Sequence, residues 1–169
     1  SPETTIDTLF GARTAEVVPD AITPALAAEL RSRWAFTRYT LVDRGSYEHA
    51  TVDEPALFAK LVEVVAKRAH VDRVVEARVL RLSPGDYLLA HHDRMHEGNP
   101  IEIVLDVSEA ATPGAEVHYR RRGAVFFRVP SQPRSLSIVE RGPTVTCNHT
   151  YVSKLHAGAS VVRLVALLR

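Results

Sequence analysis

The stretch that decides the fold is residues 74–93, V-V-E-A-R-V-L-R-L-S-P-G-D-Y-L-L-A-H-H-D. Two runs rich in apolar residues, 74–82 and 86–93, flank the turn dipeptide Pro84-Gly85, a pattern that predicts two strands joined by a tight turn. The same texture continues along the chain in the runs 101–107, 115–120, 124–129, 135–139, 144–152 and 160–168. Eight short strands at this spacing predict a β-sandwich, a barrel or a jelly roll.

The first 73 residues have a helical pattern instead. Thr23-Pro24 is a typical helix start, and apolar residues follow it at helical spacing as far as Trp34. The segment 53–55 gives the same signal for a second helix that ends near His70, and a polar loop is expected over 43–51. We therefore predict a mainly β fold with N-terminal helices (α+β), a double-stranded β-helix of the jelly-roll, cupin-like type. We expect one domain over 1–169, with 1–73 as helical buttress and loop and 74–169 as the β-helix core.

Composition limits the classes of partner. The chain has 169 residues, a formal net charge of +1 and one cysteine. A near-neutral charge gives no general attraction to nucleic acid or to anionic lipid, so neither is expected as a partner. A single cysteine excludes an internal disulfide framework, and no apolar run approaches the roughly 20 residues that span a bilayer. We expect a soluble, cytoplasmic protein.

Residues 91–96, H-H-D-R-M-H, hold the first metal-ligand candidates. Side chains alternate across a strand, so His91 and Asp93 point to one side and can chelate one ion while His92 points away. An imidazole and a carboxylate suit a divalent iron, manganese or zinc ion. In the other phase, His92 and His96 spell H-D-x-x-H, close to the helical zinc-hydrolase motif. The segment 98–100, Gly-Asn-Pro, would end such a helix within a turn of His96, which favours the strand phase.

The last third of the chain adds a second polar group. Arg163 lies in the middle of the apolar run 161–168, where a charge is costly unless it faces water, pairs with an acid or binds a ligand carboxylate. The planar guanidinium fork is suited to that last role. His149 lies in a late strand, and His156 lies next to a turn.

Four segments together resemble one known family. They are R-L-S-P-G-D-Y-L-L-A-H-H-D (81–93), G-A-E-V-H-Y (114–119), the segment 135–152, and G-A-S-V-V-R-L-V-A-L (158–167). In this order they are similar to the Fe(II)/2-oxoglutarate-dependent oxygenase superfamily, in its prolyl-hydroxylase-like branch. The resemblance covers about residues 78–168.

The resemblance implies roles for individual residues. His91, Asp93 and His149 would be the three iron ligands, with His156 as a less favoured rival of His149, and Arg163 would bind the distal carboxylate of 2-oxoglutarate. The implied cofactors are Fe(II), the cosubstrate 2-oxoglutarate and O2. Two departures concern the cosubstrate pocket: Leu82 stands where a tyrosine is usual, and Arg163 follows Gly158 by five residues instead of two.

The resemblance also implies hydroxylation of an unactivated C–H bond with release of succinate and CO2. We expect a small-molecule substrate, an amino acid or biosynthetic intermediate, with a peptidyl or prolyl residue as the alternative. A zinc-dependent hydrolase using His92 and His96, or a cupin-like binding barrel without redox chemistry, remain alternatives from other classes. Candidate substrate-binding residues are Arg94, His96, His118, Tyr119 and Tyr151.

Overall fold

The computed structural model describes residues 15–91, 101–141 and 144–169, with the backbone alone at residues 90 and 91. It contains, in chain order, β1 (Ala15–Val18), α2 (Pro24–Arg33), β2 (Thr37–Leu41), β3 (Gly45–Thr51), α3 (Pro55–Ala66), β4 (Val74–Leu82), β5 (Tyr87–His91), β6 (Ile101–Asp106), β7 (Val117–Arg121), β8 (Ala124–Val129), β9 (Leu136–Glu140), β10 (Val145–His149) and β11 (Val161–Leu168).

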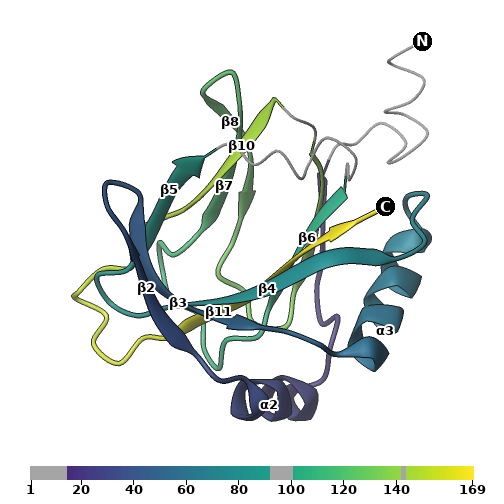
Figure 1. The fold of residues 1–169 in the computed structure, drawn as a ribbon, viewed down its shortest axis with the longest axis horizontal. Helices are drawn as coiled ribbons and strands as arrows, with labels where there is room; N and C mark the ends of the chain where they lie inside the picture. The colour runs from purple at the N-terminus through teal and green to yellow at the C-terminus, as the bar shows by residue number, and fades with distance from the viewer. Residues whose placement is uncertain (1–14, 92–100, 142–143) are drawn as a thin grey trace.

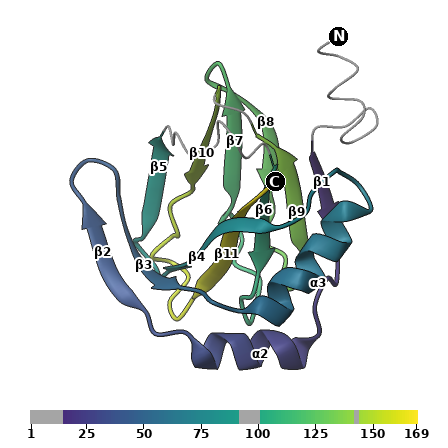
Figure 2. The same ribbon diagram turned by 45° about the vertical axis from the view of Figure 1, so that its right-hand side comes forward.

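The described strands form one antiparallel sheet that curls into a barrel. Its order is β1-β9-β6-β11-β4-β3-β5-β10-β7-β8, with β2 paired to β3. Strand β3 pairs with both β4 and β5, so it joins one half of the barrel (β1, β9, β6, β11, β4) to the other (β5, β10, β7, β8). Figures 1 and 2 show these halves facing each other, with α2 and α3 outside the first half. This is the double-stranded β-helix predicted from the sequence.

Strand β11 shows how side-chain alternation builds two cores. All eight of its residues are buried. Val162 and Leu164 belong to the core beneath the helices, together with Leu61 of α3. Val161 and Val165 belong to the core inside the barrel. Because alternate residues of a strand share a face, Arg163 lies on the inner side with them.

The structure confirms the eight predicted strands and corrects the N-terminal part. The predicted loop over 43–51 is wrong, because 45–51 forms strand β3 inside the sheet. The prediction failed because this segment is rich in polar residues. Strand β3 nevertheless pairs with neighbouring strands on both sides, and its Glu48 lies on the outer face, where it forms a salt bridge with Arg81. The second helix ends at Ala66 instead of near His70.

One irregularity in β5 affects the site. Cys147 of β10 pairs with residue 91 of β5, whereas His149 pairs with Leu88. Two residues of β10 therefore span three residues of β5, which is the signature of a β-bulge.

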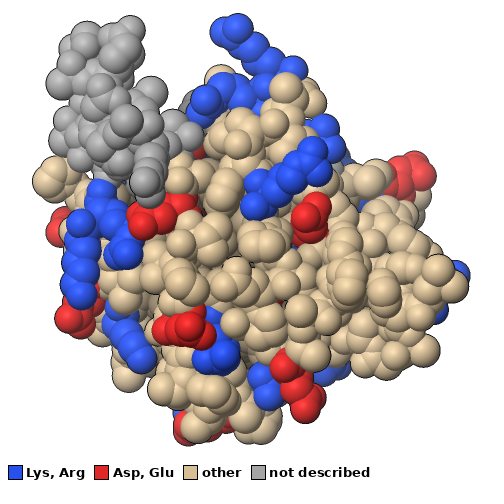
Figure 3. Space-filling model, turned by 180° about the vertical axis from the view of Figure 1, so that it is seen from behind, with Lys and Arg blue, Asp and Glu red and all other residues tan. Residues whose placement is uncertain are grey.

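The surface carries no large region of one charge on the face drawn in Figure 3, where basic and acidic side chains are interspersed. Within the described ranges, none of the helices has the length and apolar character needed to cross a membrane.

Candidate functional site

Arg163 is a charged residue buried on the inner side of the barrel. Its exposed fraction is 1%, and it pairs across β11 with Leu80 of β4 on one side and Asp106 of β6 on the other. Its Nη1 lies 3.0 Å from Nδ1 of His149, on a strand of the opposite half of the barrel. Since a guanidinium can only donate, Nδ1 accepts this hydrogen bond and the ring proton is on Nε2.

The rest of the Arg163 guanidinium forms a binding edge. Nε and Nη2 are both buried and make no hydrogen bond in the described part of the chain. These two atoms form one edge of the planar fork, the geometry that binds a carboxylate through two parallel hydrogen bonds. Burial lowers the pKa of Arg163, and the largest opposing influence is the negative charge of Asp106. The sequence-based expectation that Arg163 needs a partner is consistent with this arrangement.

Asp106 is the strand partner of Arg163, but their side chains form no salt bridge in the described part of the structure. The carboxylate is 1% exposed, and its Oδ1 accepts a hydrogen bond of 2.9 Å from the backbone N–H of Ser108. Its Oδ2 is buried and has no hydrogen-bond partner among the described residues. No ion pair within 4.0 Å joins the two side chains in the described part of the structure. The Asp106 carboxylate and the Arg163 guanidinium thus belong to directly paired residues, and each has buried polar atoms without a hydrogen-bond partner among the described residues.

His149 connects this buried pair to the outside of the barrel. It ends β10, is 3% exposed and pairs with Leu88 of β5 and Val117 of β7. It also lines a groove of about 400 Å³ over the outer face of β5, β10 and β7. The imidazole therefore contacts the barrel interior through Nδ1, and the residue also borders this groove.

The other two predicted iron ligands are only partly placed. The backbone of residue 91 ends β5 opposite Cys147. Asp93 lies outside the described residues, as do His92, Arg94 and His96. Within the residues whose side chains are described, no three His, Cys, Asp or Glu groups gather around one point. The ligand set His91, Asp93 and His149 stays a prediction.

The remaining predicted substrate-binding residues lie in different places. His118 is on the outer face of β7, where its Nε2 lies 2.9 Å from Oε1 of Glu116, and it lines the groove. Tyr151 lies after β10, is 51% exposed and also lines the groove. Tyr119 is on the inner face of β7 and is fully buried. The structure brings His118 and Tyr151 to one groove and separates Tyr119 from them. His156 lies in the loop before β11, outside this groove.

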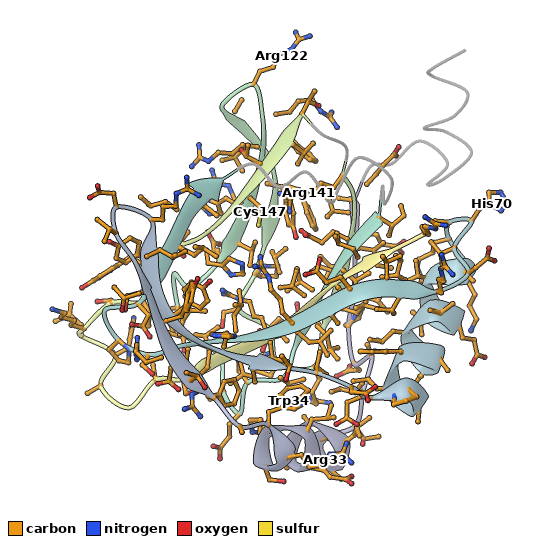
Figure 4. The ribbon with its side chains drawn as sticks, in the orientation of Figure 1. Arg33, Trp34, His70, Arg122, Arg141 and Cys147 are labelled. Atoms are coloured by element: carbon orange, nitrogen blue, oxygen red, sulfur yellow. The ribbon has the colours of Figure 1, made fainter. Side chains whose placement is uncertain are left out.

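Sequence reasoning missed a second buried charge cluster. Nη1 of Arg141 donates to both carboxylate oxygens of Glu102, at 2.8 and 2.9 Å, and the hydroxyl of Tyr119 donates to Oε2 of the same carboxylate. Burial acts to lower the pKa of Arg141, but Glu102 and other neighbours outweigh it and the pKa is raised. Figure 4 shows Arg141 near Cys147 between the two halves of the barrel. The signal was present: Glu102 interrupts an apolar strand just as Arg163 does.

Cys147 lies beside Tyr119 on the neighbouring strand β10. It pairs with residue 91 on one side and with Tyr119 on the other, and it is 6% exposed. Burial raises the pKa of its thiol to about 12. The thiol is therefore neutral at physiological pH, as expected of a core cysteine.

Comparisons with known proteins agree with this fold. No protein-family model matches the chain, and no curated protein matches its sequence. A prolyl-4-hydroxylase from Pseudomonas putida is 16% identical, covers 100% of this chain and 98% of its own, and superposes with a TM-score of 0.69. A viral collagen prolyl hydroxylase from Paramecium Bursaria Chlorella virus-1, in complex with 2-oxoglutarate, is 11% identical over 93% of this chain and 96% of its own, with a TM-score of 0.67. HygX from Streptomyces hygroscopicus, with nickel and 2-oxoglutarate bound, is 12% identical over 96% and 84%, with a TM-score of 0.61.

These likenesses define a class of fold. The chain has the double-stranded β-helix fold shared by prolyl hydroxylases and other 2-oxoglutarate–Fe(II) oxygenases. The resemblance inferred from the sequence is confirmed at the level of the fold.

Proposed function

We propose that this protein is an Fe(II)- and 2-oxoglutarate-dependent dioxygenase that hydroxylates an unactivated C–H bond of a small molecule, releasing succinate and CO2. The observation that carries the proposal is the unpaired Nε–Nη2 edge of Arg163, buried inside the barrel next to His149. A buried guanidinium edge without a partner is expensive unless a ligand completes it.

The residues fit the cofactors on chemical grounds. His91, Asp93 and His149 would supply two imidazoles and a carboxylate, the set expected for non-haem Fe(II) with open coordination positions. The backbone pairing of residue 91 with Cys147, two residues before His149 on β10, supports this set, because it brings the end of β5 beside the end of β10. When bound, Fe(II) with 2-oxoglutarate and O2 supplies the oxidising chemistry.

The chain's own residues would position and shield the reaction. Arg163 would hold the distal carboxylate through its free edge and so fix the orientation of the cosubstrate. The surrounding inner side chains, including Leu80, Val104 and Val165, are buried and apolar. They exclude water from the carboxylate, which strengthens its hydrogen bonds to Arg163.

Two further observations bear on the alternatives. Strand β5 extends through residue 91, which favours the strand phase of His91 and Asp93 over a helical His92–His96 zinc site. The structural neighbours include prolyl hydroxylases and HygX, so a peptidyl substrate remains the alternative within the proposed class.

Succinate formation from 2-oxoglutarate with Fe(II) and O2, across a panel of amino acids, biosynthetic intermediates and proline-containing peptides, tests the function. We expect substrate-dependent succinate in the wild type, its loss in His149→Gln and its retention in His156→Gln. Anaerobic Mn(II) titration should show weaker metal binding in His149→Gln than in His156→Gln. Wild-type protein that binds metal but not 2-oxoglutarate would instead indicate a binding barrel without oxygenase chemistry.

A further inference from the structure

Asp106 is the buried acid that pairs with Arg163 across neighbouring strands. Asp106 and Arg163 are directly paired residues of β6 and β11, both 1% exposed. Oδ2 of Asp106 and the Nε–Nη2 edge of Arg163 are buried without hydrogen-bond partners in the described residues. Directly paired residues have Cβ atoms about 5 Å apart, and the negative charge of Asp106 acts on the Arg163 guanidinium, so a carboxylate bound to that guanidinium would be subject to the same negative charge.

We propose that Asp106 is a specificity-determining residue of the cosubstrate subsite: it lowers the affinity for the distal carboxylate of 2-oxoglutarate and so allows 2-oxo acids with a neutral, hydrogen-bond-donating distal end to compete with it. This inference rests on the proposed function, because it takes Arg163 to be the cosubstrate-binding arginine.

The physical reason is competition between two anions for one cation. In the unliganded protein, the charge of Asp106 is the largest influence that favours the charged form of Arg163 against burial. A ligand carboxylate does the same for Arg163 but is repelled by Asp106 in a medium of low dielectric constant. A ligand amide meets both groups: its oxygen accepts from Arg163 and its NH2 donates to Oδ2 of Asp106.

Asp106→Asn isolates the charge. The asparagine oxygen can still accept from the N–H of Ser108, so the turn after β6 is kept. The new NH2 group stands in place of Oδ2 and donates to an anionic ligand. Glu109→Gln is the matched control, because Glu109 is an exposed acid three residues further along the chain.

The experiment is anaerobic calorimetry with Mn(II)-loaded protein and two ligands, 2-oxoglutarate and its distal amide 2-oxoglutaramate. We expect Asp106→Asn to bind 2-oxoglutarate at least about tenfold more tightly than the wild type and to bind 2-oxoglutaramate no more tightly. The thermal midpoint of ligand-free Asp106→Asn should fall, because Arg163 loses the negative charge that most favours its charged form. If Asp106 served only to hold the turn after β6, Asp106→Asn would lower the thermal midpoint without raising the affinity for 2-oxoglutarate.

Unchanged or weaker binding of 2-oxoglutarate by Asp106→Asn overturns the inference and leaves the proposed function standing. If neither protein binds 2-oxoglutarate, the proposed function fails and the inference fails with it. The wild type alone provides a second test that does not depend on the folding of the variant. A preference of more than about tenfold for 2-oxoglutarate over 2-oxoglutaramate also overturns the inference.

Discussion

Nη1 of Arg163 donates a hydrogen bond of 3.0 Å to Nδ1 of His149. The residue proposed to bind the cosubstrate is thus in direct contact with a residue proposed to bind the metal. This contact places the ring proton of His149 on Nε2. Metal binding through Nε2 would move that proton to Nδ1, where it would oppose an N–H of Arg163. The guanidinium would then have to turn away from the imidazole, which makes Nη1 available as well.

Arg163→Met should therefore change metal and cosubstrate binding in opposite directions. We expect 2-oxoglutarate affinity to fall at least about a hundredfold, because two hydrogen bonds to a charged group, each worth about 1.5–3 kcal/mol, are lost. Mn(II) affinity should be unchanged or higher, since the donor competing for His149 is gone. Calorimetry with each ligand measures both, with the exposed Arg128→Met as the control. Weaker Mn(II) binding in Arg163→Met alone would contradict this account.

The buried pair of Glu102 and Arg141 gives a stability prediction. Arg141→Met removes a buried countercharge of the Glu102 carboxylate and should lower the free energy of unfolding by about 3–5 kcal/mol. The double variant Glu102→Leu/Arg141→Met should be more stable than Arg141→Met, because the buried carboxylate is removed together with the guanidinium that pairs with it. Urea unfolding measures all three proteins. A double variant that is less stable than the single variant would show that the pair does not act as a unit.

Gly45 marks the closest approach of β3 to β5. A Cβ at this position would overlap the carbonyl oxygen of Tyr87 and would lie 3.0 Å from Cα of Leu88. Because backbone atoms cannot rotate aside, Gly45→Ala should cost about 1–3 kcal/mol of unfolding free energy, as overpacking does elsewhere. The neighbouring Ser46→Ala should stay within about 0.5 kcal/mol of the wild type. Equal stability of the two variants would mean that β3 can move away from β5.

Cys147 makes stability depend on alkaline pH. Burial raises the pKa of its thiol from 9.0 to about 12. The unfolded chain therefore releases this proton above about pH 9 while the folded protein keeps it, so stability is lost as the pH rises between these two values. From pH 8 to pH 10, the wild type should lose about 1.4 kcal/mol more unfolding free energy than Cys147→Ala. Equal losses in the two proteins would show that the folded thiol ionises normally.

Local patterns were enough to predict the eight strands from β4 to β11, because turn residues, mostly Gly and Pro, separate the apolar runs; β1 and β2 were not predicted. They did not predict β3: the sequence G-S-Y-E-H-A-T carries few apolar residues, and its place between β4 and β5 depends on long-range pairing. Among site residues, Arg163 could be predicted because a charge inside an apolar strand needs a partner. Asp106 could not, because an acid at the end of a strand is usual in a solvated turn, and only the register places it opposite Arg163.

The position of β11 has a consequence for how the chain folds during synthesis. This strand, formed by residues 161–168, lies between β4 and β6 in the centre of the helix-covered half. Strands β4 and β6 both pair with β11 and not with each other, so the helix-covered half of the barrel cannot be completed before residues 161–168 are available. The pairing of β11 with β4 spans about eighty residues of chain, and such distant pairing slows folding. Until then β4 and β6 present unpaired edges, and we expect chaperones to bind the nascent chain at this stage.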